Sequence, residues 1–213
     1  MGLVASLAAC APRALTITYI GHSAFEMSDG RTTLLVDYPY EPGASGYMTY
    51  DSATVRPVGR VAALFTHRHG DHFSLAPLLR ESWQVVGPRD LTALLPPERV
   101  VPPRDTIRVG DFSITALPEG GHDVEHVAYL IGWRGRRLYH SGDIRDPAGL
   151  QAMRGLDVAM VGEVLLCWMA AQRGARVDTR HLIAHHYFAG HSRGCLGARA
   201  VAQGERLVLT PAP

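Results

Sequence analysis

Hydrophobic residues in this chain fall mainly into short runs separated by glycine, proline and aspartate, a pattern typical of β-strands. Some runs alternate with polar residues, whereas VAALFT (61–66) and LDVAMV (156–161) are apolar throughout and predict strands covered on both faces. The predicted strands cover residues 14–20, 21–27, 32–38, 61–66, 84–88, 100–118 (two strands around Gly110), 126–143 (two strands around Arg134), 156–161, 181–187 and 206–210.

Helices are predicted in the segments between these strands, over residues 74–83, 147–155, 163–174 and 197–204. Residues 39–59 are rich in proline, glycine and tyrosine and predict a long loop, of a length that is usually functional or mobile. Its tyrosines are expected either to line a pocket or to lie on the surface. Strands with helices interspersed among them predict a layered α/β domain.

Composition and charge narrow the class of protein. A chain of 213 residues with 46% hydrophobic and 19% charged residues is ordinary for a globular protein, and we expect residues 14–213 to form one domain. The formal net charge of +1 gives no field that would attract nucleic acid, so the expected partner is a small-molecule substrate. All 21 basic residues are arginine, which excludes a Schiff-base lysine.

The three cysteines, Cys10, Cys167 and Cys195, are widely spaced and odd in number, so no disulfide framework is predicted. Cys167 lies in an apolar run and is expected to be a core thiol. Residues 1–13 leave two interpretations open. LAAC ending at Cys10 resembles a bacterial lipobox, which would give a lipid-anchored periplasmic protein; otherwise the segment is a tail and the protein is cytoplasmic.

Candidate chemistry concentrates in the segment THRHGDH (66–72), which follows a predicted buried strand. Residues two apart in an extended segment point the same way, so His67 and His69 can reach one point in space. Asp71 and His72 lie where the chain turns and aim at a second point. Imidazole and carboxylate groups bind zinc, iron or manganese, so this loop predicts half of a site for two adjacent metal ions.

This segment resembles the His-x-His-x-Asp-His signature of the metallo-β-lactamase superfamily, and candidates for the other motifs extend the resemblance over residues 37 to 186. The resemblance implies a four-layer αβ/βα sandwich, in which helices flank two mixed β-sheets. It also implies two divalent metal ions at one edge of the sheets, with zinc expected and iron or manganese as alternatives.

The resemblance assigns the remaining ligands. In GGHDVEH the expected ligand is His122; His126 is the rival, and would otherwise support a ligand, contact substrate or be exposed. In LIAHHYF the expected ligand is His186, with His185 as the alternative, and Asp143 in LYHSGD is the expected bridge between the metals. The implied ligands are His67, His69 and His122 for one metal, Asp71, His72 and His186 for the other, and Asp143 for both.

Several further polar residues are expected to support the site, to pack inside the protein or to lie on its surface. Asp37, which ends LLVD, is expected to brace the metal loop, and His140 is expected to pack within its strand. His181 and His191 are expected on the surface. Gly21-His22-Ser23-Ala24-Phe25 resembles a branch of small hydrolases that includes ascorbate-phosphate lactonases; His22 would either touch substrate there or be satisfied by its neighbours.

The implied activity is hydrolysis of an ester, lactone, thioester or phosphodiester by a hydroxide shared between two metals. Asp71 would orient the hydroxide, Asp143 would hold the metals together, and the leaving group would take its proton from His126, His22 or water. An iron-dependent oxidoreductase and a non-catalytic metal-binding domain are the alternatives. His69 stands where flavo-diiron reductases of this fold carry glutamate, which favours hydrolysis. Asp143 stands where common β-lactamases carry a cysteine, which disfavours β-lactam cleavage.

Overall fold

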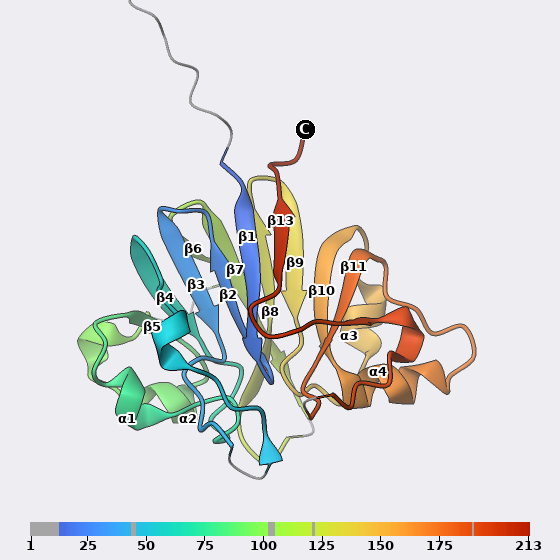
Figure 1. The fold of residues 1–213 in the computed structure, drawn as a ribbon, viewed down its shortest axis with the longest axis horizontal. Coiled ribbons are helices and arrows are strands. Elements are labelled where there is room, and N and C mark those ends of the chain that lie inside the picture. The colour runs from blue at the N-terminus through green and yellow to red at the C-terminus, as the bar shows by residue number, and fades with distance from the viewer. Residues whose placement is uncertain (1–12, 44–45, 102–104, 121, 189) are drawn as a thin grey trace, which may run out of the picture.

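Two mixed β-sheets face each other in the computed structural model, which describes residues 13–43, 46–101, 105–120, 122–188 and 190–213 (Figure 1). Sheet A has the strand order β13-β1-β2-β3-β4-β5, and sheet B has the order β12-β11-β10-β9-β8-β7-β6. The strands of sheet A are β1 (Leu15–Gly21), β2 (Ala24–Ser28), β3 (Thr32–Val36), β4 (Arg60–Leu64), β5 (Gln84–Val86) and β13 (Arg206–Leu209). Those of sheet B are β6 (Ile107–Val109), β7 (Phe112–Glu119), β8 (His126–Trp133), β9 (Arg136–His140), β10 (Leu156–Gly162), β11 (Thr179–His185) and β12 (Arg199–Ala200).

Helices cover the outer faces of the two sheets. Beside sheet A, α1 (Leu75–Leu78) and α2 (Arg89–Thr92) bury Leu78 and Leu91 against Phe65 and Phe73. Beside sheet B lie α3 (Ala148–Ala152) and α4 (Glu163–Ala170), which contribute Leu150, Leu165, Leu166 and Met169 to the main core. That core fills the space between the sheets. The order helix, sheet, sheet, helix confirms the predicted fold class.

The helices are shorter than the sequence pattern predicts. The segment 74–83 is helical only over α1, and α2 was not predicted at all. The predicted helix 197–204 is wrong: a 3-10 turn (Cys195–Gly197) leads into strand β12, which pairs with β11. Leu196 and Gly197 adopt positive φ angles of 56° and 71°, and such left-handed residues cannot continue an α-helix.

A disulfide joins Cys167 on α4 to Cys195, 28 residues further along the chain. No disulfide framework was predicted and this single bridge was missed, because spacing along a chain does not show which turns meet in space. The prediction that Cys167 is a core thiol is wrong. Cys167 is only half-buried, on the side of α4 that faces the 3-10 turn. The bridge fastens α4 to the segment that follows β11. Cys10 lies outside the described residues.

The carboxyl ends of the parallel strands meet at one edge of the molecule, the lower edge in Figure 1. The sheets are fastened to each other there by backbone hydrogen bonds. The amide of Val127 donates to the carbonyl oxygen of Thr66 over 3.0 Å, and the amide of His186 donates to that of His22 over 2.9 Å. Loops from both sheets are thus held together at the edge where the candidate ligands lie.

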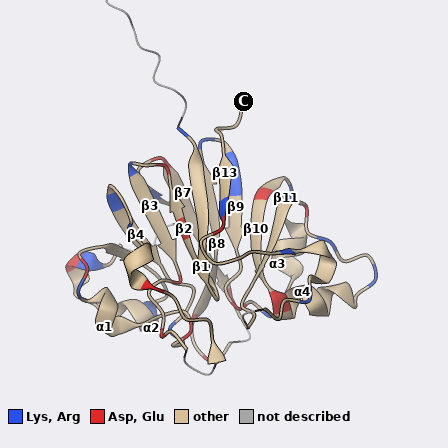
Figure 2. Cartoon of the chain, in the orientation of Figure 1, with Lys and Arg blue, Asp and Glu red and all other residues tan. Residues whose placement is uncertain are grey.

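Basic and acidic residues are distributed over both sheets, as Figure 2 shows. This agrees with a near-neutral chain, while the absence of a nucleic-acid partner stays a prediction. Within the described part of the chain, every helix is too short or too polar to cross a membrane.

Candidate metal centre

The first group of predicted ligands comes together at the lower edge. His67 and His69 follow β4 of sheet A, and His122 precedes β8 of sheet B. One nitrogen from each of the three imidazoles lies within 4.8 Å of the others, a spacing that fits a single metal ion. The structure therefore places these three residues as the resemblance implies. Their role as metal ligands stays a prediction.

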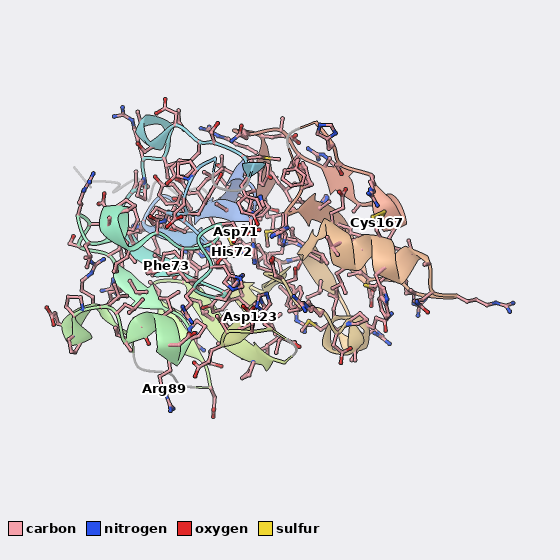
Figure 3. The ribbon with its side chains drawn as sticks, turned by 90° about the horizontal axis from the view of Figure 1, so that it is seen from below. Asp71, His72, Phe73, Arg89, Asp123 and Cys167 are labelled. Carbon is pink, nitrogen blue, oxygen red and sulfur yellow. A yellow bond between two sulfur atoms is a disulfide. The ribbon has the colours of Figure 1, made fainter. Side chains whose placement is uncertain are left out.

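Asp123 is a member of this group that sequence reasoning missed. One carboxylate oxygen lies 2.9 Å from Nδ1 of His122, and the other lies 3.4 Å from Nε2 of His69. The carboxylate itself is exposed, and Figure 3 shows it beside Asp71 and His72 in the view onto this edge. Its position directly after His122 in GGHDVEH was the available signal. It adds negative charge where His69 and His122 meet.

The second group gathers around one oxygen of Asp71. Oδ2 of Asp71 lies 3.1 Å from Nε2 of His186, 3.2 Å from that of His22 and 3.5 Å from that of His72. Asp71, His72 and His186 are the residues implied for the second metal. His22 joins them as a fourth potential ligand and is almost fully buried. His22 thus lies beside the candidate ligands and contacts Asp71, while its contact with substrate stays a prediction.

Asp143 lies between the two groups. It follows β9, and its Oδ1 is 3.2 Å from Nε2 of His72 while its Oδ2 is 2.9 Å from Nε2 of His186. With His67 and His72 it forms a third set of close ligand atoms. A carboxylate that reaches both groups from between them has the position expected of a bridge.

Asp37 fixes the loop of residues 66–72 through hydrogen bonds. Its carboxylate accepts hydrogen bonds from the amide of Thr66 (2.7 Å), the hydroxyl of Thr66 (2.9 Å) and Nδ1 of His72 (2.8 Å). Because Nδ1 of His72 donates to this buried carboxylate, Nε2 is the nitrogen that faces the site. Such carboxylate–histidine pairs fix the orientation of metal-binding imidazoles. The structure places Asp37 as the expected brace.

His126 supports Asp143 and does not face solvent. Its Nε2 accepts a hydrogen bond of 3.0 Å from the amide of Asp143, and burial lowers the pKa of the imidazole to about 4. The alternative that left His126 exposed is therefore wrong. Gly142 fits beside it, since a Cβ there would lie 2.6 Å from Nε2 of His126 and 2.7 Å from Cβ of Thr66. A positive φ of 52° also favours glycine at this position.

Two neighbouring histidines are buried away from the candidate ligands. His140 donates through Nε2 to the carbonyl oxygen of Ser23 and accepts through Nδ1 from the amide of Gly142. His185 lies between the hydroxyls of Ser23 and Ser141, 3.2 Å from each. The structure thus places His140 in the packing role expected for it. His185, the alternative to His186, is engaged elsewhere.

The long loop brings one tyrosine to the site. The ring of Tyr47 lies 4.3 Å from that of His22 and stacks on Phe188. Tyr38 and Tyr40 are buried in a separate aromatic cluster, and the hydroxyl of Tyr50 donates to the carbonyl oxygen of Tyr40. Of these four tyrosines, Tyr47 is the one that packs closest to a candidate ligand.

Charge in the site is arranged to hold cations. Burial raises the pKa of Asp71, but hydrogen bonds from His186 and His22 and the nearby imidazole of His72 outweigh it and hold this pKa well below its usual range. Burial lowers the pKa of His186, but the Asp143 and Asp71 carboxylates raise it to about 9. Both shifts have one physical cause, the attraction between these carboxylates and positive charge on the imidazoles.

The polar atoms of the site also fit a metal. Nε2 of His67, Nε2 of His72 and Oδ1 of Asp143 are buried without a hydrogen-bond partner among the described residues. Unpaired buried polar atoms are costly, and a bound ion is one of their ordinary explanations. The 3.2 Å between Nε2 of His72 and Oδ1 of Asp143 is close to the roughly 3.4 Å that separates two ligands of one tetrahedral zinc ion. The donor set therefore suits two divalent cations.

A cleft of about 440 Å³ opens beside Asp143 and His186. Its other walls come from the segment after β9 and from α4, and include Ile144, Arg145, Val164 and Trp168. A cleft of this size can hold a small molecule with one end at the candidate ligands.

Comparison with known proteins gives one family match and several similar chains. The Beta-lactamase superfamily domain matches residues 16–176. A UPF0173 metal-dependent hydrolase of Thermus thermophilus is 26% identical over 163 residues, which cover 68% of this chain and 69% of that protein. The hydroxyacylglutathione hydrolase of Actinobacillus pleuropneumoniae serotype 5b is 32% identical over 74 residues, or 33% of this chain. The match spans 31% of that relative's length.

Among solved structures, a metallo hydrolase of Ignicoccus hospitalis is similar with a TM-score of 0.65. The similarity covers 92% of this chain and 98% of that chain, at 16% identity. At this level of identity the likeness concerns the fold.

Proposed function

Because the chain belongs to the metallo-β-lactamase superfamily, we propose that it is a metal-dependent hydrolase with a dinuclear site for divalent metal ions, zinc being the expected metal. The observation that carries the proposal is the convergence of the candidate ligands around unpaired buried atoms of His67, His72 and Asp143. The name of the Thermus thermophilus relative, a metal-dependent hydrolase, supports the same activity. We further propose the branch of small hydrolases that His22 and its neighbours resemble.

In this proposal one metal is held by His67, His69 and His122, and the other by Asp71, His72 and His186. Asp143 belongs to both. Bound divalent metals supply Lewis-acid activation of water and of the carbonyl or phosphoryl oxygen of a substrate. Ester, lactone, thioester and phosphodiester bonds are the substrates that this chemistry serves.

The protein's own residues orient these groups. Asp71 presents one oxygen to three imidazoles and can also orient water that reaches the site by accepting a hydrogen bond from it. His126 is poorly suited to donate a proton to a leaving group, since its Nε2 is already occupied by the amide of Asp143 and its Nδ1 is buried without a partner among the described residues. His22 is engaged in the same way, with Nε2 3.2 Å from Asp71 and Nδ1 buried without a partner among the described residues, so we assign proton delivery to water at the site.

Metal content measured by mass spectrometry tests the proposal directly, on protein purified without chelator. We expect about two zinc ions per chain in the wild type. Asp143→Ala should lose bound metal and reduce hydrolysis by at least about a hundredfold, because the bridging carboxylate is removed. His126→Ala should keep its metal, because His126 supports only the backbone of Asp143.

The exposed His181 provides the matched control, since His181→Ala removes an imidazole far from the site. Full metal and full activity in Asp143→Ala would remove Asp143 from the bridge. Loss of one metal equivalent in His126→Ala would mean that His126 and not His122 is the ligand. Two bound irons with oxygen-dependent turnover and no hydrolysis of lactones, esters, thioesters or phosphodiesters would contradict the proposed activity.

A further inference from the structure

The cleft beside the candidate metal centre has a wall of exposed hydrophobic side chains. Val164 and Trp168 lie one turn apart on α4, so they share a face of this helix. They are 77% and 51% exposed, although large apolar side chains that have no partner are seldom left so open side by side. Both line the cleft, as do the buried Ile144 and Leu165. The cleft is thus apolar on the side away from the candidate ligands.

Arg145 gives the same cleft a positive charge. It is exposed, and it makes no ion pair with any residue in the described part of the chain. The neighbouring carboxylate of Asp146 accepts a hydrogen bond from the amide of Ala148. Arg145 lines the cleft together with His122 and Asp143. An anionic group in the cleft would therefore meet Arg145 near the candidate ligands.

The position of the cleft decides what occupies it. Asp143, His122 and His186 form its inner end, so a molecule seated on α4 reaches the candidate metals without a gap. A volume of about 440 Å³ suits a ring or a short acyl chain better than a protein segment. The disulfide between Cys167 and Cys195 holds α4, and with it Val164 and Trp168, in a fixed place.

We propose that this cleft is the substrate-binding site for an amphiphilic anion: a hydrolysable compound whose apolar group packs on Val164 and Trp168 and whose negative charge pairs with Arg145. That the bound compound is hydrolysed rests on the proposed function. That it binds here depends only on the cleft. Val164 and Trp168 set the preference for apolar groups, and Arg145 sets the preference for charge.

Binding of a fluorescent probe tests the cleft without turnover. The probe is 1-anilinonaphthalene-8-sulfonate, which has an apolar ring system and one negative charge, and it is titrated into folded protein with and without zinc. We expect Trp168→Ala and Val164→Asp to weaken binding about tenfold or more. Leu94→Ala is the matched control, because Leu94 is 50% exposed but does not line the cleft, and it should bind within about twofold of the wild type.

The charge is tested with N-phenyl-1-naphthylamine, the neutral analogue of the same probe. The wild type should prefer the sulfonate by about tenfold, and Arg145→Gln should bind the two compounds about equally. Equal binding of the sulfonate by wild type, Trp168→Ala and Leu94→Ala would overturn the proposal. An unchanged preference for the sulfonate in Arg145→Gln would overturn the role of Arg145.

Hydrolysis gives the second arm. With zinc bound, kcat/KM should rise from p-nitrophenyl acetate to p-nitrophenyl hexanoate by up to about fourfold per methylene, the gain for full burial. Trp168→Ala should lose most of this rise, whereas Leu94→Ala, outside the cleft, should keep both the rise and the activity on the acetate. Equal rates along the series in the wild type would contradict the apolar site. Absence of any zinc-dependent hydrolysis, with probe binding as expected, would contradict only the proposed function.

Discussion

Asp37 and His126 act on the candidate ligands from behind, and neither is among the seven residues assigned to metal. Asp37 turns Nε2 of His72 towards the site, and His126 fixes the amide of Asp143. At Gly142, a side chain would collide with His126 and Thr66. The positions of the ligand atoms therefore depend on buried hydrogen bonds as well as on the ligands themselves. A carboxylate such as Asp37, which hydrogen-bonds the imidazole of a candidate ligand, usually affects metal affinity when it is changed.

His140 predicts a pH dependence of stability. In the folded protein, Nδ1 of His140 accepts a hydrogen bond from the amide of Gly142, and Nε2 donates one to the carbonyl oxygen of Ser23. A second proton on this imidazole would have no hydrogen-bond acceptor. Burial lowers the pKa of His140. The unfolded chain takes up that proton near the ordinary pKa of about 6.5. Below this pH the free energy of unfolding should fall, by up to about 1.4 kcal/mol per pH unit for this group.

Urea unfolding of metal-free protein at pH 5, 6 and 7 measures this slope. His140→Gln should lower stability at pH 7 but reduce the slope by about one proton. His181→Gln, the same substitution at an exposed histidine, is measured in parallel. The same slope in wild type and His140→Gln would show that His140 does not bind a proton on unfolding.

At the scale of the elements, the centre is assembled from the ends of strands in both sheets. Sheet A provides the segment after β4 and the turn after β1, whereas sheet B provides the segments around β8, β9 and β11. Backbone hydrogen bonds between Val127 and Thr66 and between His186 and His22 fix these segments relative to one another. The site is therefore positioned by the packing of the sheets, with α4 and its disulfide as the outer wall of the cleft.

The disulfide between Cys167 and Cys195 should stabilise the protein by lowering the conformational entropy of the unfolded chain. For a loop of 28 residues, chain entropy corresponds to about 3 to 4 kcal/mol. Cys167→Ser with Cys195→Ser should lower the free energy of unfolding by about 2 to 4 kcal/mol and loosen α4. Guanidinium unfolding measures the first effect, and probe binding in the cleft measures the second.

A reducing agent provides the control for this prediction. It should bring the wild type to the stability of the double variant and leave the double variant unchanged. If reduction left the wild type as stable as before, with free thiols verified chemically, the bridge would contribute nothing. Since disulfides persist in oxidising compartments, we expect the bridge in protein made in such a compartment.

At the scale of the whole molecule, metal ions would link the two sheets. His67 and His72 follow a strand of sheet A, whereas Asp143 and His186 follow strands of sheet B. A cation bound by both groups stabilises the packed arrangement, by about 4 kcal/mol per site when free metal exceeds its Kd a thousandfold. Removing the cation should weaken the packing of one sheet on the other more than it weakens the pairing of strands within either sheet.

Thermal unfolding before and after chelation tests this link. We expect the Tm of the wild type to fall by on the order of 10 °C for one such site. Asp143→Ala, which should already lack metal, provides the comparison and should respond little to chelator. A wild-type Tm that stays constant while its metal is removed would mean that the ions do not hold the sheets together.

The sequence allowed the layered fold and most of the strands to be predicted, because apolar runs and turn residues are local signals. It also identified the residues that meet at the lower edge, since the spacing of His67, His69, Asp71 and His72 resembles a known signature. The resemblance also led to Asp143, which the structure places between the two groups.

What could not be predicted depends on contacts between distant segments. The pairing of Cys167 with Cys195 requires α4 to meet a turn whose left-handed residues, Leu196 and Gly197, also stopped the predicted helix. Asp123 gains its place only because the loop before β8 folds over His69. The burial of His126 likewise follows from the approach of sheet B to Thr66, which no local pattern shows.

The pairing of β13 with β1 has a consequence for the order of events during synthesis. Sheet A begins with residues that leave the ribosome early, but its edge at β1 is covered only by Arg206–Leu209. Until those residues emerge, the nascent chain carries an open β-edge, which can pair with other chains. His186 also emerges late, so early metal capture by the THRHGDH segment would be incomplete. Sheet A is therefore closed at this edge only after β13 has been made, however early its other strands pair.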